Sequence, residues 1–484
     1  MKKEIVRMDR VTHIERGIKL LENFNIHIFE GEIMGLLCVN RNGLEAFLKI
    51  LCHNIQVHYG YIFFNEELVN NYQHSSMKEN KVSIIEKQSH LVQDLSVADN
   101  IFVLRRGYDK YIIDNKELSR QLKHFTEEIA VDIEADQIVS RLTEMQKFIV
   151  EILKAVISGS RLIVIRELSS FIGKADILKI YEIMRYYTSR GISFLYVCNH
   201  HEEAFEICNR AAMMENGKIL KILDHREFDD RNITPYSLDF SKRNIYLPGE
   251  LKACSHGILK FKNISTENIK NMNLSIGQGE CVVILDTDNT AIQEIQELLK
   301  KPESAIKGEI MIDGTALRKN SNMTQNQIKI IGEAPLKSMI FPELSYIDNL
   351  CFLMDKKKAN IWMKKKIKKS IQSEYFSIIG EDIFAQDISA LGAKSLYNMV
   401  YYRIHLYSPK IAVCIQPFSG ADMYLRHHIT TLMRGLLEKK ITVIILALNI
   451  SDTLSVADRL VVMKRGEILE EYESKDFSSF KQKS

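Results

Sequence analysis

Two halves of this sequence repeat one another at a long and nearly constant spacing. The matching segments are GEIMGLL (31–37) with GECVVIL (279–285), DLSVADNI (94–101) with ELSYIDNL (343–350), and MMENGKIL (213–220) with VMKRGEIL (462–469). Each later segment begins 248 or 249 residues after its earlier counterpart. A register held over so much of the chain indicates a duplicated domain rather than an array of short repeats. The fold is therefore limited to two copies of one architecture.

The repeat suggests boundaries for both copies. We expect a first domain over 1–240, a linker over 241–254 and a second domain over 255–484 of the 484 residues. Each copy is long enough to bury a substantial core of its own. The stretch between the copies is polar and shows neither helical nor strand periodicity, which is typical of a linker.

Composition restricts the classes of function. The net charge is only +3, which is too small to indicate a nucleic-acid partner. The eight cysteines form no CxxC pair, so we expect reduced thiols and no metal site. No apolar run approaches the ~20 residues of a transmembrane helix, and no signal peptide is recognisable. We expect a cytoplasmic chain that can reach a membrane only through a partner.

The strand pattern indicates an α/β fold. Each copy opens with short alternating segments, as antiparallel strands do. Continuous apolar runs follow at RLIVIRE (161–167), SFLYVCN (193–199), KIAVCIQ (410–416) and TVIILALN (442–449). Such runs, separated by helical stretches, are typical of a sheet covered by helices on both faces. A helix is expected after Gly43, because Leu44, Phe47, Leu48 and Leu51 share one helical face.

The order of strand, glycine-bearing loop and helix resembles the tandem ATP-binding subunits of sugar-import ABC transporters of the ribose/galactose class. The resemblance implies two tandem ABC-type P-loop NTPase-like domains, each with a mixed-sheet core, an antiparallel β subdomain and a helical arm. It further implies ATP and Mg²⁺ as cofactors, a membrane permease or a sensory protein as partner, and an internal pseudo-dimer of the two domains. The expected location is the cytoplasm, at the inner face of the cell membrane.

In that family a loop G-x-x-x-x-G-K-[ST] cradles phosphates, with its Lys on the β/γ oxygens and its hydroxyl on Mg²⁺. The first copy reads CVNRNGLEA, with Cys38 at the first Gly of the motif. The candidate cofactor-binding residues are Asn40, Arg41, Asn42, Gly43, Leu44, Glu45 and Ala46. Leu44 stands at the Lys, and Glu45 and Ala46 at the Ser/Thr pair.

The second copy departs further from the phosphate motif. Its loop reads DTDNTAIQE, with Asp286 at the first Gly, Ala291 at the last Gly and Ile292 at the Lys. Carboxylates near a phosphate repel it, by about 4 kcal/mol for a pair ~4 Å apart at an effective dielectric constant near 20. We expect the second site to be the drier one, with Ile292 facing Ile415.

The remaining family motifs are altered in register. Where the family ends a strand with Asp-Glu-Pro, the first copy reads Arg166-Glu167-Leu168 and the second Ile415-Gln416-Pro417. Glu167 is thus the one candidate catalytic residue, a relic of the base that positions the attacking water. The switch histidine is replaced by Asn199. The signature segment LSGGQ becomes LTEMQ (142–146) and LGAKS (391–395). Within LTEMQ, Thr143 and Gln146 have the spacing of a capping box at the start of a helix.

These substitutions leave three interpretations open. The first is a catalytically degenerate homologue, a pseudo-ATPase that serves as an interaction or regulatory module. The second is a divergent, weakly active ATPase that energises carbohydrate import with Glu167 as base. The third is a chain that binds nucleotide in the first copy without turnover. Glu45 and Arg166 stand where the family places two Mg²⁺ ligands. Their side chains are expected either to form an ion pair with each other or to turn to solvent. If the ion pair is buried, the effects of removing its two partners on stability should be strongly coupled.

Overall fold

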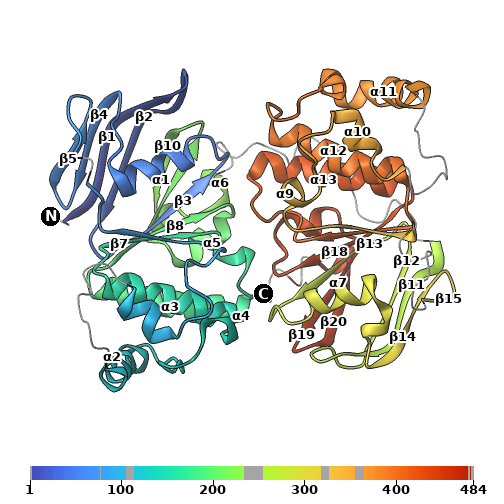
Figure 1. Cartoon of the computed structure of the whole chain (residues 1–484), viewed down its shortest axis with the longest axis horizontal. Helices are drawn as coiled ribbons and strands as arrows, with labels where there is room; N and C mark the ends of the chain where they lie inside the picture. Colours follow the sequence, from blue (N-terminus) through green and yellow to red (C-terminus); the bar gives the residue numbers. More distant parts are fainter. Residues whose placement is uncertain are drawn as a thin grey trace. The chain divides into compact units, whose positions relative to one another are not determined.

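The structure is a computed structural model that describes residues 3–76, 78–104, 114–233, 254–317, 326–354, 365–477 and 480. The chain divides into two compact units, Met1–Asp239 and Phe240–Ser484, here called domain 1 and domain 2 (Figure 1). Of the expected linker 241–254, only its last residue belongs to the described part of the chain.

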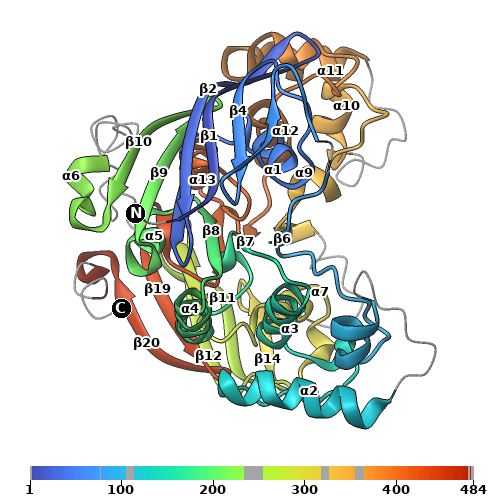
Figure 2. The same ribbon diagram turned by 90° about the vertical axis from the view of Figure 1, so that its left-hand side faces the viewer.

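Domain 1 begins with an antiparallel sheet. Its strand order is β2-β1-β4-β5 (Figure 1; β1, β2 and β4 also in Figure 2), formed by β1 (Glu4–Glu15), β2 (Ile18–Phe29), β4 (Tyr59–Phe64) and β5 (Glu67–Asn71). Alternate residues of β2 are buried, including Phe24, Ile26 and Ile28. One face of the sheet therefore packs on the core, as the alternating sequence predicts.

The second sheet of domain 1 has six strands in the order β10-β9-β3-β8-β7-β6. These are β3 (Ile33–Cys38), β6 (Val82–Ile85), β7 (Leu162–Arg166), β8 (Ser193–Cys198), β9 (Arg210–Glu215) and β10 (Lys218–Asp224). All neighbours pair in parallel except β9 and β10, so the sheet is mixed. Successive apolar residues of β7 alternate between two hydrophobic clusters. Leu162 and Val164 belong to one cluster, and Ile163 and Ile165 belong to another. The strand is apolar throughout because both of its faces are covered.

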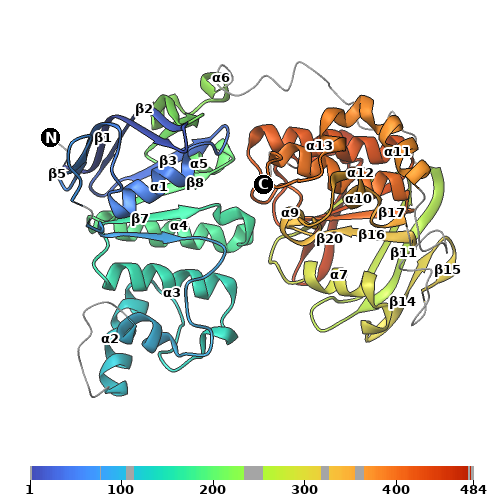
Figure 3. The ribbon, with the colours of Figure 1, turned by 45° about the horizontal axis from the view of Figure 1, so that its top comes forward.

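Helices cover both faces of the six-stranded sheet. The helices of domain 1 are α1 (Leu44–His53), α2 (Asn115–Glu128), α3 (Glu144–Ile157), α4 (Lys174–Ser189), α5 (His201–Ile207) and α6 (Asp230–Ile233), with short turns η1 (Asp99–Val103), η2 (Val139–Arg141), η3 (Leu168–Ser170) and η4 (His225–Glu227). Helix α1 lies on one side of the sheet and α3 on the other, while α2 lies at the end of the domain away from β1 and β2 (Figures 1 and 3). Leu44, Phe47, Leu48 and Leu51 form the buried face of α1, as predicted.

Domain 2 contains the same two kinds of sheet. Its strands are β11 (Cys254–Ser265), β12 (Met272–Gln278), β13 (Cys281–Asp286), β14 (Lys307–Ile312), β15 (Thr315–Ala316), β16 (Ile328–Ile331), β17 (Ile411–Ile415), β18 (Thr442–Ala447), β19 (Arg459–Lys464) and β20 (Glu467–Glu473). Its helices are α7 (Ile292–Lys300), α9 (Pro335–Ser338), α10 (Tyr346–Cys351), α11 (Lys365–Ile379), α12 (Ala393–Tyr407) and α13 (Met423–Glu438), with η6 (Pro302–Ser304), η8 (Gly380–Phe384), η9 (Ser451–Ser455) and η10 (Ser474–Asp476).

The two domains have one topology. The antiparallel sheet of domain 2 runs β12-β11-β14-β15, and the six-stranded sheet runs β16-β17-β18-β13-β19-β20, which is the order of domain 1 read from its other edge. Strands β7 and β17 are thus equivalent, and the residue after each has a left-handed backbone, with φ of 52° at Glu167 and 43° at Gln416. The predicted duplication is confirmed down to this local conformation.

Candidate functional site

The candidate residues of domain 1 meet at the carboxyl edge of its six-stranded sheet. Residues 39–43 connect β3 to α1, Glu86 follows β6, Glu167 follows β7 and Asn199 follows β8. The carboxyl ends of parallel strands lie along one edge, where open α/β sheets bind ligands. Residues distant in sequence are brought together here by the sheet alone.

Asparagine side chains hold the loop of domain 1 in place. The Asn40 side-chain oxygen accepts hydrogen bonds from the backbone N–H groups of Asn216 (3.0 Å) and Asn42 (3.2 Å). The side-chain amides of Asn40 and Asn42 donate to the Asn216 side-chain oxygen at 3.1 and 3.0 Å. The loop is therefore tied to the turn between β9 and β10. Gly43 begins α1 with a φ of 85°, a left-handed conformation that glycine adopts without strain.

Arg41, the cation of the loop, forms an ion pair with Glu167. The two side chains are 31% and 18% exposed, so the pair is partly shielded from water. The side-chain amide of Asn199 also donates to Glu167 Oε1, at 3.2 Å. The candidate base Glu167 is thus held by two residues of the same domain.

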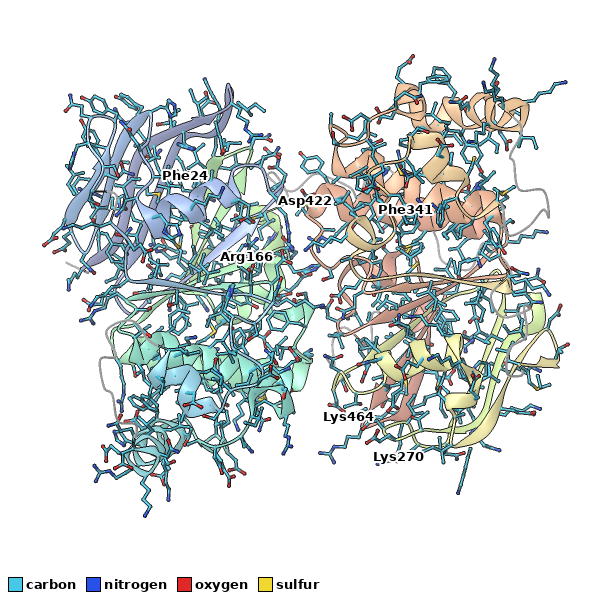
Figure 4. All side chains as sticks on the ribbon, in the orientation of Figure 1. Phe24, Arg166, Lys270, Phe341, Asp422 and Lys464 are labelled. Carbon is cyan, nitrogen blue, oxygen red and sulfur yellow. The ribbon has the colours of Figure 1, made fainter. Side chains whose placement is uncertain are left out.

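Arg166 forms a second set of ion pairs in the centre of domain 1 (Figure 4). Its Nη2 lies 2.5 Å from Glu45 Oε1, and its Nη1 lies 3.2 Å from Glu86 Oε2. The bridge between Glu45 and Arg166 is therefore present. It is not buried, because the Glu45 side chain is 66% exposed while that of Arg166 is 17% exposed. The apolar residues of α1 face the core, which leaves Glu45 on the solvent side of the first turn.

The exposed position of Glu45 makes its bridge a weak contributor to stability. In a double-mutant cycle of Glu45→Leu and Arg166→Leu under chemical denaturation, we expect a coupling of about 0.2–1 kcal/mol, as for other exposed pairs. Arg166→Leu alone should cost more than Glu45→Leu, because it also leaves Glu86 without this partner. A coupling of about 3–5 kcal/mol, typical of a broken buried pair, would contradict the observed exposure.

The remaining loop residues of domain 1 are part of its core. Leu44, at the position of the family's Lys, is 1% exposed, and Ala46 is 7% exposed. Both belong to the hydrophobic cluster shared by α1 and the antiparallel sheet. Neither position brings a charge or a hydroxyl toward a ligand.

The corresponding loop of domain 2 contains a buried carboxylate. Asp286 is 0% exposed, and its Oδ2 accepts hydrogen bonds from the backbone N–H groups of Ala291 (2.6 Å) and Ile292 (3.1 Å). These are the first amides of α7, which in the family's motif point at phosphate. Ile292 and Ile415 are both 6% exposed and belong to one hydrophobic cluster. That the two side chains face each other across a drier site stays a prediction.

Burial raises the pKa of Asp286 above the ordinary 3.8, although hydrogen bonds from the Ala291 and Ile292 amides oppose the shift; the nearby Asp288 carboxylate adds to it. A raised pKa in the folded state means that protonated Asp286 contributes stability below about pH 4, and that this contribution is lost as pH rises through the folded pKa. The unfolding free energy of Asp286→Asn, which cannot titrate here, should therefore rise relative to wild type from pH 4 to neutral pH. Chemical denaturation at several pH values measures this difference. A difference that stays constant with pH would contradict it.

Neither the place of Glu86 in the site nor the contacts of Asp286 were expected from the sequence. Glu86 was not among the candidate residues, and its signal in the sequence is its position directly after the strand that borders β7. Asp286 was identified as an anion that would repel phosphate, yet the structure places its carboxylate on the amides themselves. An acid six residues before the first residue of a helix lies outside the usual N-cap spacing, so only the folded loop reveals the contact.

The signature segment of domain 1 starts α3 with a capping box. Thr143 accepts from the Gln146 N–H at 3.2 Å, and the Gln146 side chain accepts from the Thr143 N–H at 3.0 Å, as the spacing predicts. In the part of the chain that the structure describes, no cluster of three or more His, Cys, Asp or Glu could hold a metal ion. Within the same residues, no helix is long and apolar enough to cross a membrane.

Comparison with known proteins shows what the chain resembles. Residues 21–169 match the ABC transporter family model. A ribose import ATP-binding protein, RbsA of Clostridium perfringens strain SM101, is 24% identical over 473 residues, which cover 96% of this chain and 94% of that protein. The chain is thus similar, over nearly its whole length, to an ABC-type ATP-binding protein. MglA of Haemophilus influenzae strain KW20, a galactose/methyl galactoside import ATP-binding protein, is 22% identical over 475 residues, 96% of this chain and 93% of that one.

The similarity to these relatives spans both halves of the chain, in agreement with its duplicated fold. Among solved structures, the ATP-binding cassette MJ1267 in its ADP conformation aligns with 50% of this chain and 99% of its own, with a TM-score of 0.43 and 17% identity. The resemblance to tandem sugar-import ATP-binding subunits, inferred from the motifs, is confirmed by the relatives that match almost the whole chain.

Proposed function

We propose that this chain is a degenerate homologue of the ATP-binding subunits of sugar-import ABC transporters, and that it serves as a non-hydrolysing interaction or regulatory module. Its partner would be a membrane permease or a sensory protein, contacted at the inner face of the cell membrane. The observation that carries this proposal is the ion pair between Arg41 and Glu167, which joins the loop cation to the candidate base.

Hydrolysis by this fold needs a polar side chain that is available to orient the attacking water. In P-loop NTPases, a polar side chain orients the attacking water while a Lys and Mg²⁺ neutralise the developing charge. Here Glu167 is engaged by Arg41 and by Asn199. The same contact holds the cation of the loop on a protein carboxylate. One pair thus reduces both the positioning of water and the binding of phosphate.

The residues present do not fit Mg·ATP in the way that the family motif does. Two guanidinium groups, of Arg41 and Arg166, pair with three carboxylates, of Glu45, Glu86 and Glu167. The cluster therefore has more negative than positive charge, which disfavours a phosphate group. Both of its guanidinium groups already pair with carboxylates, so neither is left over to bind a phosphate. Leu44 and Ala46, buried in the core, supply neither the Lys nor the Mg²⁺-binding hydroxyl.

A weakly active ATPase is the second candidate. One observation favours it: Glu167 keeps both the residue type and the strand-end position of the family's base. Nucleotide binding by domain 1 without turnover is a third possibility, since the loop keeps its shape through the asparagine contacts.

Two measurements distinguish these candidates: steady-state hydrolysis of Mg·ATP and equilibrium binding of Mg·ATP. Both are made on the purified full chain and on its Glu167→Gln variant. If the chain neither hydrolyses nor binds Mg·ATP, the result supports an interaction module. Binding without hydrolysis supports the third candidate. Turnover near 1 s⁻¹, a value typical of slow enzymes, that disappears in Glu167→Gln would establish the ATPase and refute the proposal.

A further inference from the structure

The loop of domain 2 wraps around its own carboxylate. Asp286 ends β13, and its Oδ2 accepts from the amides of Ala291 and Ile292 at the start of α7, at 2.6 and 3.1 Å. Helix N-termini attract anions because their first N–H groups lack partners within the helix and carry partial positive charge. A carboxylate enclosed by these amides therefore has the same kind of contact that a bound phosphate would have.

Domain 1 shows that this fold does not require an acid at that position. The equivalent residue there is Cys38, which is 3% exposed, and the amide of Leu44 donates instead to the backbone oxygen of Arg41 at 3.1 Å. In domain 2 the burial of Asp286 raises its pKa, so the carboxylate carries a desolvation cost that a neutral residue would avoid. The acid is thus a particular feature of domain 2 and not a necessity of the topology.

Other contacts hold the loop of domain 2 in its curled shape. The backbone N–H and the hydroxyl of Thr287 both donate to the Met463 oxygen, at 3.1 and 3.0 Å. The Arg465 N–H donates to Asp288 Oδ2 at 2.6 Å. Because these bonds anchor the loop to the β19–β20 turn, its shape does not depend on Asp286 alone.

We propose that the loop of domain 2 keeps an anion-binding arrangement of backbone amides and that Asp286 fills it permanently, as an internal substitute for phosphate. Domain 2 is then closed to phosphate-bearing ligands, and any response of the chain to nucleotide is confined to domain 1. This inference goes beyond the proposed function, because it holds whether or not domain 1 binds or hydrolyses ATP.

A selective isotope label can report on this loop alone. The sequence contains two Ala-Ile pairs, Ala291-Ile292 and Ala305-Ile306. The full-length protein is labelled with ¹³C at alanine carbonyls and with ¹⁵N at isoleucine. A spectrum that selects ¹³C-bonded ¹⁵N then shows only the amides of isoleucines that follow an alanine, which gives two signals. Ile292 is the amide bound to Asp286, whereas Ile306 is 69% exposed and serves as the internal control. Inorganic pyrophosphate is the probe, titrated into wild type, Asp286→Ala and Asp286→Asn.

In the wild type, we expect the chemical shift of the Ile292 amide to be unchanged by pyrophosphate. In Asp286→Ala, we expect the Ile292 signal to shift with pyrophosphate until it saturates, while the Ile306 signal does not shift. Asp286→Asn, which keeps an oxygen of the same reach, should respond at least tenfold more weakly than Asp286→Ala. A pyrophosphate-dependent shift of Ile292 in wild type would overturn the proposal. So would a folded Asp286→Ala protein whose Ile292 signal does not respond.

Asp286→Gly provides the second removal variant if the alanine variant does not fold, since glycine is the residue of the family motif at this position. Equivalent pyrophosphate responses in Asp286→Asn and in either removal variant would also refute the internal-substitute role. Ile292 lies in domain 2, so none of these outcomes depends on ATP turnover, and a failure here is distinguishable from a failure of the proposed function.

Discussion

The purified chain is expected to show no Mg·ATP hydrolysis above the uncatalysed background, and Glu167→Gln is expected to change nothing. Loss of one preorganised electrostatic group commonly lowers the rate by about 10²–10³. In domain 1 the Lys of the phosphate loop is the buried Leu44, and the Mg²⁺-binding acid is Arg166, which pairs with Glu45 and Glu86. Several such losses in one site leave little catalysis to measure.

Phosphate release under saturating Mg·ATP is the appropriate measurement. Arg41→Ala is the informative companion variant, because it removes the cation that pairs with Glu167 without touching the carboxylate. If that pair alone suppressed an otherwise competent site, hydrolysis would rise in Arg41→Ala and fall again in the double variant with Glu167→Gln. We expect both variants to remain inactive, since the Lys and the Mg²⁺ ligand are still missing.

Replacing Gly43 by alanine is expected to destabilise domain 1 by about 2–5 kcal/mol. The left-handed backbone at φ 85° costs a non-glycine residue about 1–2 kcal/mol. A Cβ at this position would also lie 2.1 Å from the Leu20 oxygen and 2.9 Å from the Gly217 Cα, and such overpacking adds about 1–3 kcal/mol. Chemical denaturation followed by circular dichroism measures the loss.

Gly17→Ala is the matched control for this substitution. Gly17 has a similar φ of 80°, but its added Cβ would meet nothing within 4 Å. This variant should lose only the backbone term of about 1–2 kcal/mol. Equal losses in the two variants would show that the close approach of the loop to Leu20 is relieved by a small backbone shift.

The position equivalent to Gly43 has a different backbone conformation in domain 2. Its last motif Gly is replaced by Ala291, whose φ is −104°, a conformation open to any residue. The loop there no longer depends on a left-handed glycine, because the Asp286 carboxylate organises the start of α7. The two domains have therefore lost the phosphate motif in different physical ways, one through ion pairs between side chains and the other through a buried carboxylate.

Much of the architecture could be predicted without coordinates. The repeat register predicts the duplication, and the apolar runs at 161–167 and 410–416 predict buried strands of the kind seen at β7 and β17. Periodicity predicts the buried face of α1, and spacing predicts the Thr143–Gln146 capping box. These features are local or depend on which residues are apolar, so the sequence determines them directly.

The charge arrangement of the sites was decided by tertiary structure. The family motifs brought Glu45 and Arg166 together as candidates, but only the fold shows that Glu45 is exposed and that Glu86 shares the guanidinium. The contacts of Arg41 with Glu167 and of Asp286 with α7 likewise join groups whose side-chain directions no motif specifies. The sequence by itself determined the duplicated α/β fold and the absence of the phosphate-binding residue types, because hydrophobic pattern and residue identity are properties of the chain. Which charges pair was settled by the tertiary structure, because pairing depends on distances of a few ångströms between loops that the sheet brings together.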